Sequence, residues 1–96
     1  MSVLTGEASR TDLLNRLKRP EGQLRGIRRL LEEGQECTDI ATQVAAVRKA
    51  LHSTYVRMTV CFLHQELQSH SREAAGGERQ LQSVLEDVQT LLNKIR

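Results

Sequence analysis

The feature that most constrains this chain is an apolar repeat that meets no helix-breaking residue over positions 40–67. Its members recur in steps of three and four: Ile40, Val44, Val47, Leu51, Tyr55, Met58 and Phe62. This spacing is typical of one face of an α-helix. Thr38 and Asp39 are predicted to cap its start, and the next breakers are Gly76 and Gly77. The repeat therefore predicts a helix of about 35 residues, on the order of 50 Å long.

The later half of this long helix carries a second apolar stripe on its opposite side. Its members are Val56, Val60, Leu63 and Leu67. A chain of 96 residues is too small to cover both sides of so long a rod by itself. We therefore predict that antiparallel helices from a second chain complete a four-helix bundle, and that such dimers pair into a dimer of dimers.

Two shorter amphipathic segments flank the long helix. Leu13, Leu17, Leu24, Ile27 and Leu31 predict a helix over roughly 10–33, with Pro20 at the one position that breaks the series and Gly34 placed to end it. Leu81, Val84, Leu85, Val88, Leu91, Leu92 and Ile95 predict a third helix, which covers the second stripe or joins dimers into tetramers. The fold class is thus all-α, a single domain over 1–96 with three helices per chain and a flexible segment over 1–9.

The composition excludes several classes of protein. No apolar run approaches the roughly 20 residues that span a bilayer, and the N-terminus lacks the pattern of a signal peptide, so we expect a cytoplasmic protein without a membrane partner. A glycine-rich phosphate loop and a carboxylate pair in a plausible cleft are both missing, which predicts that the protein is not an enzyme. With only two aromatic residues there is no stacking platform for RNA.

Basic residues are concentrated near the N-terminus. Half of the 14 lysines and arginines lie within the first 30 positions: Arg10, Arg16, Lys18, Arg19, Arg25, Arg28 and Arg29. Only Glu7, Asp12 and Glu21 oppose them there. Such a block suggests a polyanionic partner, and an oligomer would present several copies of the same positive surface to it. A solvated helix face is an equally simple interpretation.

The segment Arg16–Ile27, with the sequence RLKRPEGQLRGI, resembles the signature of the copper-sensitive operon repressor family, which also includes nickel/cobalt, formaldehyde and persulfide sensors. Cys37, Asp39 and Gln43 resemble the start of that family's second helix, and the resemblance extends over roughly 12–95. It implies a helical transcriptional repressor that binds double-stranded operator DNA without inducer and releases it when an inducer engages Cys37. In this picture phosphate contacts come from Arg16, Lys18, Arg19, Arg25, Arg48 and Lys49.

The chain departs from the family at the positions that complete the copper site. There the copper sensors carry a histidine and a second soft ligand, whereas this chain has Phe62 and Glu66, so only Cys37 transfers. Cys61 and His64 are substitutes that, with Cys37 across a dimer interface, suit Cu(I) or Zn(II). A harder alternative adds Glu66 and His70 to Cys37 for Ni(II) or Zn(II).

The inducer is therefore left open by the residues. Cys37 and Cys61 can instead act without a metal cofactor, as a thiol switch that a reactive sulfur species bridges. A formaldehyde-responsive repressor of the same family is a further alternative, as is a helical protein–protein adaptor without specific DNA binding. For Cys61 the simplest interpretation is a small buried apolar residue, and for each histidine a solvated side chain.

Overall fold

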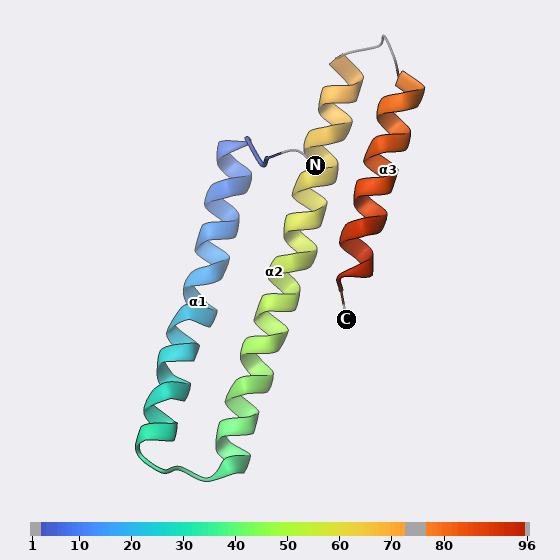
Figure 1. Ribbon diagram of the computed structural model, residues 1–96. Helices are drawn as coiled ribbons and strands as arrows, with labels where there is room; N and C mark the ends of the chain where they lie inside the picture. Colours follow the sequence, from blue (N-terminus) through green and yellow to red (C-terminus); the bar gives the residue numbers. More distant parts are fainter. Residues whose placement is uncertain (1–2, 73–76, 96) are drawn as a thin grey trace.

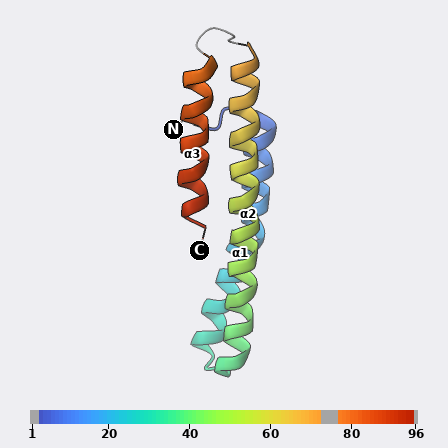
Figure 2. The same ribbon diagram turned by 90° about the vertical axis from the view of Figure 1, so that its right-hand side faces the viewer.

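The computed structural model describes residues 3–72 and 77–95, and the side chains of 3–69 and 81–95. Three helices follow one another: α1 (Glu7–Glu32), α2 (Cys37–Arg72) and α3 (Gly77–Asn93). α1 and α2 form a long antiparallel hairpin, and α3 runs back along the end of α2 that lies away from the hairpin turn (Figure 1; Figure 2). The all-α prediction with three helices is confirmed, and the chain measures 61 × 26 × 14 Å.

α1 is one turn longer at its start than its apolar repeat indicates. It begins at Glu7, directly after Gly6, and it continues through Pro20, whose ring is fully buried. Within the segment 1–9, Glu7–Ser9 belong to the helix and Val3 and Thr5 are hydrogen-bonded to Gln65 on α2. The flexibility of this segment stays a prediction. Residues 1 and 2 lie outside the described part of the chain.

The turn between α1 and α2 has the geometry that its glycine predicts. Gly34 has φ +69°, in the left-handed region that glycine adopts without strain. Its N–H donates to the Leu31 carbonyl at 3.2 Å, and the Gln35 N–H donates to the Leu30 carbonyl at 3.0 Å. These two bonds satisfy carbonyl groups that the end of a helix otherwise leaves without partners.

α2 starts earlier than predicted. The Ile40 N–H donates to the Glu36 carbonyl at 3.2 Å, so Cys37 is already the first helical residue. The predicted caps, Thr38 and Asp39, are therefore wrong as caps and lie within the first turn, where the Thr38 carbonyl accepts a bond from Thr42 Oγ1. The predicted length is confirmed, because α2 contains 36 residues without interruption.

The buried residues follow the two contacts that α2 makes, one with α1 and one with α3. They are Pro20 and Ile27 on α1, Val47, Thr59, Cys61 and Phe62 on α2, and Val84 and Leu91 on α3. The Tyr55 hydroxyl also donates to the Leu91 carbonyl, which ties the C-terminal part of α3 to the middle of α2. The core of the chain is thus a narrow band on either side of α2.

One of the two alternatives predicted for α3, that it covers the second apolar stripe of α2, is wrong. Val56, Val60 and Leu67 remain 42–48% exposed, because α3 packs on the side of α2 that carries Tyr55. Part of the first stripe is also uncovered, since Val44 is 48% and Leu51 44% exposed. A single chain therefore leaves apolar surface on two sides of its longest helix.

Candidate functional site

The two cysteines lie at different places on α2. Cys37 is the first residue of the helix and is exposed to solvent. Cys61 is only 5% exposed. They are 24 positions apart on one helix, or about 36 Å at 1.5 Å per residue. One chain does not bring the two thiols together.

Cys61 and His64 line a cavity of about 350 Å³ between α2 and the start of the chain. Thr5, Gly6 and Ser9 cover it on one side, and the remaining lining comes from Gln65, Gln68 and Ser69 of α2. The structure therefore confirms that Cys61 and His64 share a side of the helix. That side faces the N-terminal residues of its own chain.

The predicted three-ligand metal site is not assembled within one chain. Among the described residues, no three His, Cys, Asp or Glu side chains are grouped as metal ligands. Cys37 with Cys61 and His64 therefore stays a prediction that needs a second copy. The side chain of His70 lies outside the described residues, so the set with Glu66 and His70 also stays a prediction.

Basic side chains from two helices meet in one groove. Arg16 and Arg19 of α1 and Lys49 of α2 line a hollow of about 600 Å³ together with Asn15, Gln23, Ala46, Ala50, Ser53 and Thr54. The Gln23 side-chain oxygen is buried there without a hydrogen-bond partner. Three of the six predicted DNA-binding residues are thus neighbours in space. The polar side chains beside them were not predicted, because the sequence analysis considered only the basic residues.

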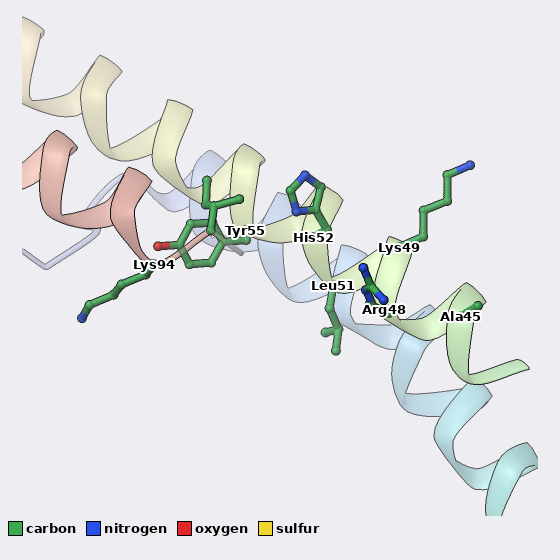
Figure 3. A pocket seen from close by; sticks show the side chains of 8 residues that line it. Ala45, Arg48, Lys49, Leu51, His52, Tyr55 and Lys94 are labelled. Carbon is green, nitrogen blue, oxygen red and sulfur yellow. The ribbon is translucent and has the colours of Figure 1, made fainter. Parts of the chain in front are cut away.

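A second basic pocket lies beside the end of α3. It has a volume of about 730 Å³ and is lined by Ala45, Arg48, Lys49, Leu51, His52 and Tyr55 of α2 with Lys94 and Ile95 (Figure 3). Lys49 and Lys94 extend away from each other in this view, so their charges border the pocket at opposite ends. Lys18 and Arg25 are exposed and line neither hollow.

Asp12 of α1 forms ion pairs with one arginine on each of the first two helices. Its carboxylate accepts a bond from Arg16 Nε at 3.0 Å and another from Arg57 Nε of α2 at 2.9 Å. The bonds from Arg57 and then Arg16 lower the pKa of Asp12, and the bond to Asp12 is the main cause that raises the pKa of Arg57. No sequence signal links Asp12 with Arg57, because they are 45 positions apart.

Comparison with known proteins identifies the family. The family model of metal-sensitive transcriptional repressors matches residues 9–95, nearly the whole chain. The chain belongs to this family. Its members are transcriptional repressors and not enzymes, and as a family they bind DNA and form oligomers.

Two relatives and one solved structure show which known proteins this metal-sensitive repressor is similar to. The copper-sensing transcriptional repressor RicR of Mycobacterium tuberculosis is 49% identical over 43 residues, which is 45% of either chain. The copper-sensing repressor CsoR of Bacillus subtilis is 31% identical over 74 residues, covering 77% of this chain and 72% of that one. The nickel-responsive regulator InrS has the same fold, with a TM-score of 0.71 at 24% identity over 100% of this chain and 99% of that chain.

For a metal-sensitive repressor, the residues at the family's usual ligand positions are unusual. Phe62 is 3% exposed, and its ring has no atom that can bind a metal. Glu66, at the second position, is half-buried. The standard copper donor set therefore does not fit this chain beyond Cys37. No helix in the described part of the repressor is both long and apolar enough to cross a membrane.

Proposed function

We propose that this protein is a transcriptional repressor that binds double-stranded operator DNA and releases it when an inducer engages Cys37. Membership of the metal-sensitive repressor family supports the first half of this proposal. The observation that carries it is the groove in which Arg16, Arg19 and Lys49 lie together. Three cations from two antiparallel helices offer a phosphate backbone several contacts at once.

Arg48 extends the proposed DNA surface. It shares a pocket with Lys49, so the positive surface continues from the groove along α2. Lys18 and Arg25 contact phosphates in this proposal from the exposed side of α1. Because most of these contacts are ionic, affinity is expected to fall steeply with salt concentration.

Cys37 is the proposed inducer contact because its thiol is exposed at the start of α2. Copper-sensing relatives support Cu(I) as the inducer, and a thiol is a ligand that Cu(I) prefers. Zn(II), Ni(II) and a reactive sulfur species remain alternative inducers. A three-ligand site that joins Cys37 to Cys61 and His64 of a second copy requires the buried thiol of Cys61 to become accessible.

The proposed assembly is a dimer in which the helical hairpins pair, and a dimer of dimers beyond it. Its support is the exposed apolar surface on α2 at Val44, Leu51, Val56 and Val60. A charged residue within such an interface should weaken the assembly, because an unpaired charge is costly to bury. We expect Val44→Asp to lower the oligomeric state in sedimentation analysis. An unchanged assembly would place the interface elsewhere.

Fluorescence anisotropy with DNA from the protein's own promoter region tests the proposal. The reduced protein should prefer this DNA to random DNA by a factor of about 10³ or more. Cu(I), Zn(II), Ni(II), a persulfide donor and formaldehyde are then added in turn. Cys37→Ala should bind DNA like the parent and resist release. Equally weak binding to both DNAs would instead favour the alternative that the protein is a helical protein–protein adaptor without specific DNA binding.

Substitutions in the groove test which residues touch DNA. Arg16→Ala and Lys49→Ala should each weaken binding on every sequence and reduce the slope of log affinity against log salt by about 1. Arg28→Ala is the matched control, since Arg28 is an exposed α1 arginine outside both basic hollows. Equal effects of all three variants would mean that the groove has no special role.

A further inference from the structure

The N-terminal strap, the segment Val3–Gly6, lies beside a pocket that is lined by the thiol of Cys61 and by the imidazole of His64, which is exposed. Gln65 of α2 fixes the strap with three hydrogen bonds. Its side-chain oxygen accepts from the Thr5 N–H at 2.8 Å and from Thr5 Oγ1 at 3.2 Å, and its amide nitrogen donates to the Val3 carbonyl at 2.9 Å. One glutamine thus holds the strap at the edge of the pocket lined by Cys61 and His64.

The chemistry of this pocket differs from that of an ordinary core position. Cys61 is 95% buried, yet its thiol lines a cavity of about 350 Å³, and none of the hydrogen bonds among the described residues involves its sulfur. His64 lies one turn along the same helix, the spacing at which helical side chains are neighbours. The rest of the lining consists of hydroxyl and amide side chains and Gly6, without a carboxylate.

This donor set selects among metal ions. Hard cations such as Mg²⁺ or Ca²⁺ require several oxygen ligands, usually including carboxylates, which this pocket does not offer. Zn²⁺ in a structural site takes four ligands. Thiolate is a soft ligand and imidazole suits copper, so the pair fits a soft monovalent cation that accepts few ligands.

We propose that Cys61 and His64 form a binding site for a soft monovalent cation, such as Cu(I), within one chain and separate from Cys37. On binding, the thiol proton leaves to solvent, a metal–sulfur bond forms to Cys61 and a metal–nitrogen bond forms to His64. No oxidant or reductant is needed, because the charge of the ion does not change. This site does not depend on DNA binding.

An anaerobic competition titration of the full chain with Cu(I) and a chromogenic Cu(I) chelator tests the site. Cys37→Ala should still bind one Cu(I) per chain, because the site does not use Cys37. Adding Cys61→Ala to that variant should abolish this binding, and adding His64→Ala should weaken it at least about tenfold. Adding His52→Ala is the matched control, since His52 is an exposed histidine of α2 that lines a different pocket.

Two outcomes would overturn the proposal. If Cys37→Ala bound no Cu(I), the two cysteines would belong to one site shared between chains. If His64→Ala and His52→Ala weakened binding equally, His64 would not be a ligand. X-ray absorption of Cu(I)-loaded Cys37→Ala does not require the Cys61 variant to fold, and it should show one sulfur and one nitrogen neighbour. Two sulfur neighbours would exclude the site. That result would leave the proposed operator binding untouched, because the anisotropy experiment on the parent tests it separately.

Discussion

The two halves of α2 carry the same helical repeat but have different surroundings. In the half that starts at Cys37, α1 is the helix that packs along α2, and Val47 is the one buried residue over 37–50. The half that follows Tyr55 lies between α1 and α3, with the N-terminal strap beside it (Figure 1), and buries Thr59, Cys61 and Phe62. Periodicity fixes which side of a helix is apolar, whereas the number of neighbouring elements decides how much of that side is buried.

This difference gives the two thiols different accessibility. Cys37 lies where solvent, an inducer or a second chain can reach it. Cys61 is buried, and it lines a cavity beside the strap. The exposed half also carries Val44 and Leu51, whose apolar side chains have little cover within one chain. A second copy would cover this half, and it would also cover Val56, Val60 and Leu67, which stay 42–48% exposed in the half around Cys61.

The largest expected effect separates the two halves by stability. Phe62→Ala should destabilise the chain by about 3–5 kcal/mol, because it removes a large side chain from the buried half and leaves a cavity. Val44→Ala should cost less than about 0.5 kcal/mol in a single chain, because Val44 is 48% exposed. Urea denaturation at several protein concentrations measures both. A loss for Val44→Ala that grows with concentration would show that a second chain covers this half.

Thiol reactivity should separate the halves next. With an aromatic disulfide reagent, we expect Cys37 to react at least about 100-fold faster than Cys61, whose exposure requires local opening that costs about 2.7 kcal/mol or more. Cys61→Ala and Cys37→Ala report the two rates separately. Gln65→Ala should speed the reaction of Cys61 alone, because it removes the three bonds that hold the strap. Similar rates for both thiols in the parent would contradict the burial of Cys61.

Helix number and order were predictable because they depend on local pattern. The apolar repeats predict all three helices, and Gly34 predicts the end of α1 because only a left-handed residue fits there. The start of α2 was displaced towards the N-terminus, because Thr38 and Asp39 are good caps in either register and the Glu36 carbonyl accepts the first bond instead. Side-chain preference at a helix end therefore predicts its position only to within a few residues.

The partners of the site residues were not predictable, because they come from distant parts of the chain. Gln65 holds Thr5 across 60 positions, and Arg57 reaches Asp12 across 45. The pattern also does not indicate which side of α2 receives α3. The grouping of Cys61 with His64 was predictable from helical spacing, whereas the strap beside them was not.

A smaller effect is expected where α3 meets the middle of α2. Tyr55→Phe removes the hydroxyl that donates to the Leu91 carbonyl and leaves the ring in place. A hydrogen bond of this kind contributes about 1 kcal/mol. Hydrogen exchange should show faster exchange over α3 and unchanged exchange around the α1–α2 turn. Faster exchange at that turn as well would mean that α3 stabilises both halves of α2.

The smallest effect concerns Asp12, which ties α1 to the buried half of α2 through Arg57. The folded state lowers the pKa of Asp12, so its charge stabilises the fold above the unfolded pKa of about 3.9. This contribution disappears as pH falls through the lower folded pKa. Both ion pairs are partly exposed, so salt should screen them.

Asp12→Asn should therefore be slightly less stable than the parent at pH 7 and low salt, and this deficit should shrink at acid pH and in about 1 M salt. Urea midpoints under the three conditions provide the measurement, and a deficit that persists at high salt would point to packing. The same variant also tests the DNA surface. Asp12 competes with phosphate for Arg16, so removing its charge should leave operator affinity equal or higher even as the fold loses stability.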